Sequence, residues 1–553
     1  MNSSFKSELK TVFKVAKWEF FLKFFISVLL RGILLIIPLL FSEAINCVTK
    51  GDQNRAIFLI VVSIVVAAVY RFFEGYNQVC FYKLYDRLFL YYNDLGIKKT
   101  KDNSLFSLSR FSPGQYTNIV ITDVDIVAGF FANGVLRVVQ IIEYLVIFIY
   151  FWFIDIYIFG ITVIVSTIML IVAIKSGNRI QRYNEKRKVN LDKMTTSMYD
   201  YFGAIREVKS FNIFEKVYPM TIDKSKDYLS SNTKYNVRFN CDNSAFLFVF
   251  ELFRLLVIIY AIFEIGNGNM DVGILLILYN YYQKIIDNFS IILTTNVDFR
   301  SFKVSLQRFN KVLEYSRNSN DGLILDRKDI TGNITFNNVL YGFKESPILN
   351  RISFSIPSNS ITVLSGNDES SQVGIFDLLL KLNRQHEGTI SIDDYLISDI
   401  SDECYYSLVS SVRRQTIFFD ISIRDNFLMV NNDFDKIVEI CKRMGIDDEI
   451  NLLEKGYDTI LTDNTPVTLS FKKMLVIVRM LLKESKILLF DDVINVLEEK
   501  HEKRLIELMM NMKNDHTIIM VTNSKRIIDR ADLVLDISSN NVNVVKEWFV
   551  LIL

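Results

Sequence analysis

The sequence predicts a multidomain protein in which an all-α transmembrane domain of six helices precedes an α/β domain. Three observations predict this architecture. Half of the 553 residues are hydrophobic. Every apolar run of about 20 residues, the length that crosses a bilayer, lies before residue 300. After about residue 320, short β-rich runs bounded by turn residues alternate with helical stretches, which is typical of a soluble α/β domain.

Residues 1–19 predict an amphipathic helix at the membrane surface. Basic side chains recur along this stretch, and no small-residue cleavage site closes a short apolar core, so we do not expect a cleaved signal peptide. No peptidase domain precedes the first span, and we therefore expect no cleavage of a leader peptide by this chain.

The transmembrane domain is expected over residues 20–310. Its six apolar runs lie at 20–41, 56–76, 129–153, 156–174, 245–265 and 272–294. Two long segments, 77–128 and 175–242, are rich in Lys and Arg, whereas the short connectors carry mainly acidic residues. The positive-inside rule therefore predicts that the N-terminus and both long segments are cytoplasmic. Their helical pattern predicts that the spans continue past the bilayer as stalks.

The polar stretch 311–330 predicts a linker, and residues 331–553 predict the α/β domain. The strands expected in this domain are Ile334–Phe336, Ile352–Ile356, Ile361–Leu364 and Thr389–Ile392.

Charge and composition exclude several classes of protein. The formal net charge of +1 provides no basic field for nucleic acid, so we expect no nucleic-acid partner. The five cysteines are scattered singly, and the three histidines lack paired-ligand spacing. The sequence therefore predicts neither a disulfide framework nor a metal site built from these residues.

Short motifs in both domains occur in an order that resembles the ATP-binding-cassette (ABC) exporter family over nearly the whole chain. These motifs are Phe111–Asn118, Thr122–Asp125, Gly203–Phe211, Lys455–Thr459, Leu469-Ser470 and Lys486–Asp491. The resemblance implies that the first three belong to cytoplasmic loops whose short coupling helices contact the nucleotide domain. It also implies a P-loop-type nucleotide-binding fold for the α/β domain and a multi-pass location in the plasma membrane.

The chemistry of a phosphate-binding loop is missing where the family has one. A P-loop reads G-x-x-x-x-G-K-[ST], because Lys pairs with the phosphates and the hydroxyl binds Mg²⁺. Between the strand Ile361–Leu364 and an expected helix Ile375–Leu382, the chain has Gly366 but places Gln372 at the lysine position and Val373 at the hydroxyl position.

Two carboxylates oppose an anion at the same place. Asp368 and Glu369 lie at a helix N-terminus that would otherwise receive the phosphates, and they satisfy the helix dipole themselves. A like charge about 5 Å away costs about 3 kcal/mol at an effective dielectric near 20, or about a hundredfold in affinity. Tight binding of ATP and Mg²⁺ by this chain is therefore not expected.

Other positions of the family's site agree. Asp491 retains the acid that binds Mg²⁺ through a water, but Asp492 replaces the catalytic Glu and is one methylene shorter. Asn523 stands at the switch histidine and cannot relay a proton. The magnesium-binding glutamine aligns with Arg414, with Gln415 one residue away. One further residue, Phe343, retains an aromatic ring either for stacking on adenine or for plain packing.

The signature sequence, which in this family caps the nucleotide of a partner domain, is also altered. It reads Leu469-Ser470-Phe471-Lys472-Lys473 and keeps the capping hydroxyl of Ser470, but both glycines are lost. Phe471 and Lys472 are expected to crowd the approach to the γ-phosphate. The ammonium of Lys472 or Lys473 has two open interpretations, since it either pairs with that phosphate or faces solvent.

Ionisable residues within the spans are expensive in hydrocarbon and therefore face a cavity or each other. They are Arg31, Arg137, Glu143, Glu251, Arg254 and Lys284. Two interpretations of Glu251 and Arg254, three residues apart, stay open. Either they neutralise each other on one helix, or they line a cavity with Tyr279, Tyr281 and Tyr282 that suits an amphipathic or zwitterionic substrate such as a peptide.

These observations favour the degenerate, non-catalytic half of an ABC exporter. The resemblance implies that a second half-transporter with an intact P-loop binds most of the ATP and Mg²⁺. This chain's own site is expected to be weak or empty, with no catalytic residue and no metal ligand. That site comprises Phe343, Gly366, Gln372, Ser470 and Asp491. The alternative is a membrane scaffold or immunity protein that does not transport. Membrane lipids and a peptide or amphipathic substrate are the remaining expected partners.

Overall fold

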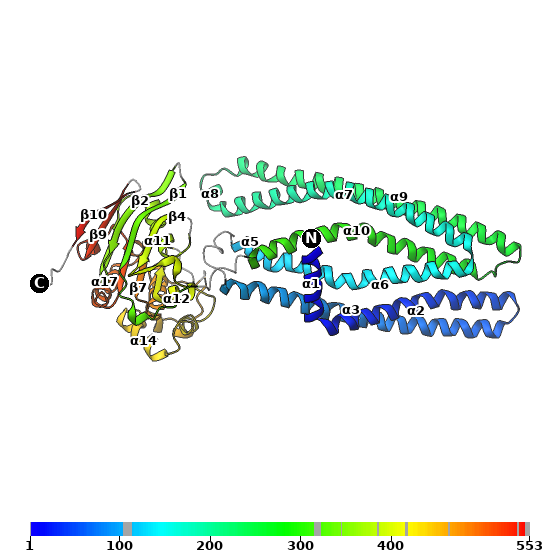
Figure 1. The fold of residues 1–553 in the computed structure, drawn as a ribbon, viewed down its shortest axis with the longest axis horizontal. Coiled ribbons are helices and arrows are strands. Elements are labelled where there is room, and N and C mark those ends of the chain that lie inside the picture. Colours follow the sequence, from blue (N-terminus) through cyan, green and yellow to red (C-terminus); the bar gives the residue numbers. More distant parts are fainter. Residues whose placement is uncertain are drawn as a thin grey trace. The chain divides into compact units, whose positions relative to one another are not determined.

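The computed structural model describes two compact units, one of long helices and one built on β-sheets (Figure 1). The described residues are 2–102, 113–314, 322–343, 346–383, 386–414, 418–462, 465–538 and 541–547. The first unit contains residues 1–97 and 114–311, and the second contains 98–113 and 312–553. The expected linker 311–330 falls partly on 315–321, which lie outside the described residues.

Helices make up the first unit. A short helix, α1 (Asn2–Val15), corresponds to the expected surface helix and is separated from the next one by Ala16. The helices that follow are α2 (Lys17–Thr49), α3 (Gln53–Asp102), α5 (Pro113–Asn118), α6 (Val124–Ile154), α7 (Ile156–Gly203), α8 (Ile205–Ser210), α9 (Phe214–Gly266) and α10 (Ile274–Glu314). A π-helical turn, Ile119–Asp123, joins α5 to α6.

Among the described residues, five helices are long and apolar enough to cross a membrane: α2, α3, the run Gly114–Ile154, α7 and α9. They carry the first five predicted spans. The sixth predicted span, 272–294, lies on α10, which is not among these five and interrupts its apolar residues with Gln283, Lys284 and Asp287. Transmembrane passage of α10 therefore stays a prediction.

The helices that carry the second, fourth and fifth predicted spans continue unbroken beyond those spans. Helices α3, α7 and α9 contain 50, 48 and 53 residues, more than twice the length that spans a bilayer. Helix α7 begins sharply because the Asp155 carboxylate accepts hydrogen bonds from the backbone N–H groups of Tyr157 and Ile158. Helices α7 and α9 then pack side by side.

The core of this unit joins α6, α7, α9 and α10. Phe151, Phe250 and Val257 are buried there. By contrast, large apolar side chains such as Phe153 and Phe263 face outward on the same helices. An outward apolar face is unfavourable in water and favourable in lipid, which agrees with a multi-pass membrane domain.

The structure decides between the two interpretations of the charged residues on α9. Glu251 and Arg254 form an ion pair, as the self-neutralising interpretation requires, and Arg254 also donates to Gln283. Tyr281 and Tyr282 are buried, and their hydroxyls bond to the Leu35 carbonyl and to the Thr162 hydroxyl (2.8 and 2.5 Å). The expectation that these two tyrosines line a cavity is therefore wrong.

Two sheets form the framework of the second unit. A four-stranded sheet has the order β2-β1-β4-β5, and a six-stranded sheet has the order β10-β9-β3-β8-β7-β6. Their strands are β1 (Ile334–Phe343), β2 (Ser346–Ile356), β3 (Ile361–Ser365), β4 (His386–Ile392), β5 (Tyr395–Leu396), β6 (Val409–Val412), β7 (Ile487–Asp491), β8 (Thr517–Val521), β9 (Leu533–Ser538) and β10 (Asn541–Glu547). All four predicted strands are present.

The six-stranded sheet is parallel from β9 to β6 and is buried on both faces. Successive side chains of a strand point to opposite faces, so Ile518 and Met520 of β8 enter one core while Ile519 and Val521 enter the other. The helices of the unit are α11 (Glu369–Leu379), α12 (Asp402–Leu408), α13 (Ile423–Leu428), α14 (Phe434–Arg443), α15 (Asp447–Asn451), α16 (Leu469–Leu481), α17 (Glu499–Met512) and α18 (Lys525–Ile528).

One predicted helix begins at a different residue. The sequence predicted Ile375–Leu382, whereas α11 starts at Glu369 and ends at Leu379. The earlier start has a local cause, because the Asp368 side chain caps the helix by accepting from the backbone N–H of Ser371. Gln372 consequently lies in the first turn of the helix.

Candidate functional site

Four neighbouring strands of the parallel sheet bring the candidate residues to one edge. In the order β3-β8-β7-β6, the chain leaves these strands at Gly366, Thr522-Asn523, Asp491 and Arg413-Arg414. Ligands of parallel α/β sheets bind at the carboxyl ends of the strands. The predicted residues Gly366, Gln372 and Asp491 therefore lie at the position expected for a nucleotide site.

The loop after β3 is closed by two amide side chains. Gly366 has φ +115°, and a Cβ there would lie 2.3 Å from the Ile537 carbonyl oxygen, so only glycine fits. The Asn523 amide accepts from Gly366 N–H at 3.1 Å and donates to its carbonyl at 3.3 Å. Gln372 Nε2 donates to the same carbonyl at 3.1 Å. Both backbone groups of this glycine are thus occupied within the chain.

A carboxylate occupies the N-terminus of α11. Asp368 accepts from Ser371 N–H (3.1 Å) and from the hydroxyls of Ser370 and Ser371 (both 2.7 Å). Such an arrangement satisfies the helix end with a resident negative charge. The prediction that Asp368 satisfies the dipole is therefore confirmed.

A guanidinium lies among three carboxylates at this edge. Arg414 is 3.2 Å from Glu369, 3.6 Å from Asp491 and 3.5 Å from Asp492. Burial raises the pKa of Asp492, as do the Asp491 and Glu369 carboxylates, while Arg414 opposes the shift. Asp492 has φ +47° and accepts from Asn495 Nδ2 at 2.5 Å. The sequence had indicated only that Arg414 stands where the family has its magnesium-binding glutamine.

Side chains that would meet a magnesium triphosphate are engaged within the chain. That group requires a lysine for its phosphates and hydroxyl and carboxylate oxygens for its metal. Here the Gln372 amide is turned onto Gly366, and the Asp491 carboxylate is already paired with Arg414. Among the described residues, no three His, Cys, Asp or Glu side chains converge as a metal site.

Lys473 of the signature sequence has a role that neither prediction described. It is fully buried, and its ammonium donates to the carbonyls of Arg413 (2.8 Å) and Arg414 (2.7 Å). Burial lowers the pKa of Lys473, and Asp491 and Asp492 oppose that shift. Lys473 thus contacts the segment that carries Arg414. Both the solvent-facing and the phosphate-pairing interpretations are wrong for this residue.

Phe471 of the signature sequence is also turned inward, whereas Leu469 is exposed. Thr468 caps α16 by accepting from Phe471 N–H, and Phe471 is buried in the core. Its ring therefore does not crowd the surface, contrary to expectation. Lys472 instead donates to the Thr462 carbonyl at 3.2 Å.

The hydroxyl of Ser470 is held inside the domain. It accepts from Glu498 N–H at 2.9 Å and lies 2.6 Å from His501 Nδ1, whose Nε2 is 2.9 Å from Glu449. An ionised Glu449 can only accept, so Nε2 carries a proton and donates to it, and in the neutral ring Nδ1 then accepts from the Ser470 hydroxyl. Although burial opposes it, hydrogen bonds from Lys500 and His501 lower the pKa of Glu449. The sequence had suggested that Ser470 is a free capping group, but its hydroxyl is bonded within the domain.

The structure does not describe some residues that the sequence analysis named. Phe343 ends β1, and its side chain is outside the described residues, as are Gln415 and the motif residues Phe111 and Ser112. Sequence analysis missed the Arg414 cluster and the hydrogen bond between Ser470 and His501. The first depends on the pairing of the strand before Arg414 with the strand that ends at Asp491, which only the structure shows. The second joins residues 31 positions apart and had none.

Comparison with known proteins agrees with this architecture. Residues 20–287 match the model of the ABC transporter transmembrane region. The chain is 23% identical over 572 residues to a protein of Rickettsia typhi described as an export ATP-binding/permease protein, with 97% of this chain and 95% of that protein aligned. It is 24% identical to the lactococcin-G-processing and transport ATP-binding protein of Lactococcus lactis, over 63% of this chain and 52% of that one.

Coverage and fold similarity differ among the matches. A Mycoplasma genitalium ABC transporter ATP-binding protein is 26% identical over 65% of this chain, which spans 64% of that relative's length. A solved bacterial Atm1-family ABC exporter with ATP bound has a TM-score of 0.82 at 17% identity, covering 96% of this chain and 95% of its own. This structural similarity concerns the fold.

Proposed function

We propose that this chain is a half of an ABC exporter that does not hydrolyse ATP. Its transmembrane region matches the ABC transporter model and its fold is that of an ABC exporter, a multi-pass membrane protein with a cytoplasmic nucleotide-binding domain. It would pair with a different half whose P-loop is intact, and that partner would bind most of the ATP and Mg²⁺. The pair would form an asymmetric exporter.

The observation that carries this proposal is the position of Arg414. Its guanidinium lies within 3.6 Å of Glu369, Asp491 and Asp492, so the carboxylate that would serve Mg²⁺ is neutralised by a resident cation. A metal entering this cluster would have to displace a hydrogen-bonded arginine. The two amides on Gly366 support the same conclusion, because they use the backbone groups that a phosphate loop needs.

A partner is required by symmetry. Two copies of this chain would contain two copies of the same loop, and neither would supply a lysine for the phosphates. One competent site is enough to cycle a pair of nucleotide domains when its closure and opening move both halves. A heterodimer therefore accounts for an exporter fold that lacks this chemistry.

A second candidate, a membrane scaffold or immunity protein that does not transport, is favoured by one observation. Ser470 is bonded to His501 and Glu498 instead of standing free, which weakens the cap that this chain would offer to a partner's nucleotide. If the chain is half of an exporter, we expect slow ATP hydrolysis at the site formed by the partner's P-loop and this chain's signature sequence. If the chain is a scaffold or immunity protein, we expect no ATP hydrolysis.

The substrate proposal extends from the relatives' names. The Lactococcus lactis relative processes and transports a lactococcin, and a Haemophilus influenzae relative, 23% identical, is an ATP-dependent lipid A-core flippase. A peptide or another amphipathic molecule is therefore the substrate class we propose for the assembled exporter.

Affinity purification of the full chain from its native membrane in mild detergent, with mass spectrometry and an ATPase assay of the eluate, tests the proposal. We expect a second half-transporter at equal stoichiometry and activity that is lost when the partner's P-loop Lys is replaced. Mg²⁺-dependent crosslinking of an azido-ATP is expected on the partner and not on this chain. Recovery of the chain alone, with tight ATP binding of its own, would contradict the proposal.

A further inference from the structure

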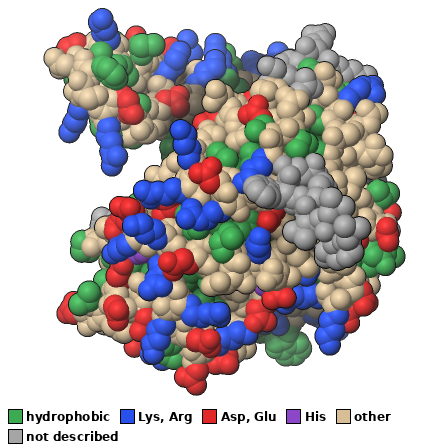
Figure 2. Space-filling view, turned by 90° about the vertical axis from the view of Figure 1, so that its left-hand side faces the viewer, with side chains coloured by type: hydrophobic (Ala, Val, Ile, Leu, Met, Phe, Trp, Pro, Cys, Tyr) green, Lys and Arg blue, Asp and Glu red, His purple; other side chains and the backbone are tan. Residues whose placement is uncertain are grey.

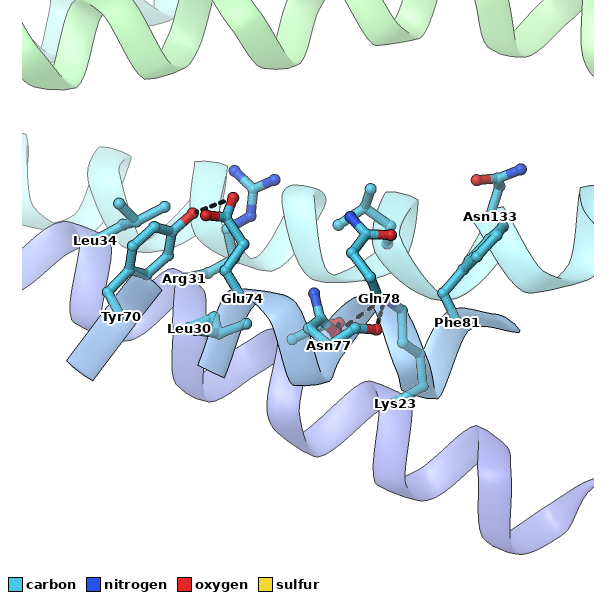
Figure 3. Close-up of a pocket in the computed structure, with 12 residues that line it drawn as sticks. Lys23, Leu30, Arg31, Leu34, Tyr70, Glu74, Asn77, Gln78, Phe81 and Asn133 are labelled. Atoms are coloured by element: carbon cyan, nitrogen blue, oxygen red, sulfur yellow. Dashed lines mark hydrogen bonds between the residues drawn. The ribbon is translucent and has the colours of Figure 1, made fainter. Parts of the chain in front are cut away.

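A polar pocket of about 280 Å³ lies between α2, α3 and α6 of the membrane unit (Figure 3). Apolar side chains of Leu30, Leu34 and Leu136 line part of it, beside the polar residues. In Figure 3, Arg31 from α2, Glu74 and Gln78 from α3 and Asn133 from α6 are drawn around one hollow. The sequence motifs assigned no role to this place.

One end of the pocket holds a buried ammonium without a carboxylate partner. Lys23 is 3% exposed, and its Nζ donates to the backbone and side-chain oxygens of Asn77 at 3.0 and 2.9 Å. Ser27 donates to the same Asn77 side chain, and the Phe81 ring lies 5.5 Å from the ammonium. Among the described residues, no Asp or Glu oxygen lies within ion-pairing distance of Lys23. A buried charge without an opposite charge is costly.

The other end has two cations for one carboxylate. Arg31 lies 3.1 Å from Glu143, whose side chain is fully buried, and Lys284 lies 3.6 Å from the other oxygen of the same carboxylate. Glu74, on the pocket wall, is held by Arg71 at 2.8 Å. Asp287 also lies close enough to Lys284 to act on its charge. These groups contain four cations (Lys23, Arg31, Arg71 and Lys284) and three anions (Glu74, Glu143 and Asp287), so a net charge of +1 lies in and around the pocket.

We propose that this pocket binds the anionic head of an amphipathic molecule, a phosphate or a carboxylate, between Lys23 and Arg31. These two residues are eight positions apart on one helix, or about 12 Å at 1.5 Å per residue. An anion between them would supply the charge that the pocket lacks, and the leucine side chains would contact the first part of an apolar tail. The volume holds a head group and leaves a long tail outside.

This inference deepens the proposed function by naming a ligand class for the membrane unit, but binding here needs neither ATP nor a partner. The inference can therefore be tested independently of the proposed function. If the chain proves to be a scaffold, a bound anionic amphiphile remains expected. If an exporter pair is found without such binding, the inference fails while the proposed function stands.

The test measures binding of dodecyl phosphate to the full chain in dodecyl maltoside, by native mass spectrometry over a concentration series. The expected result is saturable binding that falls about tenfold or more in Lys23→Gln, since a charge-assisted hydrogen bond contributes about 1.5–3 kcal/mol. The matched control is Lys50→Gln, at the outer end of the same helix, where the ammonium is exposed. This variant is expected to bind as the unaltered chain does.

A second variant protects the test against misfolding. Glu74→Gln removes a negative charge from the pocket wall and is expected to leave binding equal or tighter, opposite in sign to Lys23→Gln. Equal binding by the unaltered chain and Lys23→Gln, or weaker binding by Glu74→Gln, would overturn the proposal. So would an absence of any saturable binding to the folded chain.

Inorganic phosphate separates two sources of the anion. Competition by inorganic phosphate at concentrations similar to those of dodecyl phosphate would identify a soluble anion as the ligand. Binding of dodecyl phosphate without such competition would identify a lipid-like amphiphile. In both cases an anion occupies the pocket. Equal retention of uncharged dodecanol would instead show that the tail alone is recognised, and it would overturn the proposal.

Discussion

Charged side chains at the sheet edge of the nucleotide-binding domain are paired with one another, whereas those around the membrane pocket outnumber their partners. At the edge, Arg414 is shared by Glu369, Asp491 and Asp492. In the membrane unit, the hydrogen bonds of the Lys23 ammonium go to the oxygens of Asn77. The edge has more carboxylates than cations and therefore repels an anion, whereas a buried ammonium without an opposite charge gains from one. The comparison therefore supports the proposal that an anion binds in the membrane unit.

On the face that Figure 2 shows, Lys and Arg side chains are accompanied by Asp and Glu. This mixture agrees with a net charge of +1 over the whole chain. The positive excess around the membrane pocket therefore does not reflect a generally basic protein.

The largest expected effect comes from restoring the phosphate site. Gln372→Lys with Val373→Ser alone is expected to leave Mg²⁺-ATP binding weaker than micromolar, because the carboxylates and Arg414 remain. Adding Asp368→Ser, which preserves the helix cap, Glu369→Gln and Arg414→Gln should raise affinity about a hundredfold, from the like-charge repulsion of about 3 kcal/mol that is removed. Equilibrium binding of a fluorescent ATP analogue to the full chain measures this.

The control for this series replaces Arg413 instead of Arg414, because Arg413 pairs with Asp377 at 3.2 Å and not with the carboxylates of the cluster. That variant should recover no affinity. Tight Mg²⁺-dependent binding of ATP by the unaltered chain would contradict the electrostatic argument. The sheet edge would then be a ligand site, and the contrast with the membrane pocket would be lost.

The next effect concerns the support of the Arg414 segment. Lys473→Met keeps the side-chain volume but leaves the Arg413 and Arg414 carbonyls without their donor. We expect the free energy of unfolding to fall by about 2 kcal/mol, since buried acceptors that lose a partner cost about 1–3 kcal/mol. Urea denaturation of the full chain, monitored by circular dichroism, measures it. Lys472→Met, next to it and partly exposed, should cost less than about 0.5 kcal/mol.

Much of the fold could be predicted from the sequence because burial periodicity dictates it. Apolar runs of span length identified the membrane helices, and β-rich runs identified β1 to β4. The start of α11 was predicted six residues late, because a polar stretch that includes Asp368 and Glu369 looked like a loop. Its cap depends on one side-chain hydrogen bond that hydrophobic periodicity does not report.

The candidate site was predicted less well than the fold. Residue types at motif positions predicted that Gln372 and Asp368 are unsuited to a triphosphate, and this stays a prediction. They did not reveal that Arg414 pairs with Asp491 or that Ser470 bonds to His501, because these contacts join residues 77 and 31 positions apart. Such contacts follow from strand order and helix packing, which a single sequence does not contain.

Removing the central cation of the cluster has a smaller expected effect. Arg414→Met leaves Glu369, Asp491 and Asp492 without an opposite charge, but Arg414 is partly exposed and solvent screens the loss. We expect the free energy of unfolding to fall by about 1 kcal/mol at pH 7 and by less near pH 3, where the carboxylates are protonated. Arg443→Met removes an exposed pair with Glu439 and should have no measurable effect. Equal losses of unfolding free energy in both variants would show that the Arg414 cluster stabilises the fold no more than an exposed ion pair does.

The smallest expected effect has the opposite sign. Because burial raises the pKa of Asp492, its ionised form destabilises the fold at neutral pH, and this cost disappears as the pH falls below the range in which Asp titrates. Asp492→Asn keeps the oxygen that accepts from Asn495, and asparagine tolerates the positive φ of this position. We expect the variant to be more stable by less than about 1 kcal/mol at pH 7 and equal to the unaltered chain near pH 3. Chemical denaturation at both pH values measures the difference. A loss of stability at pH 7 would mean that the Asp492 charge is needed to hold Arg414 even though Glu369 and Asp491 remain beside it.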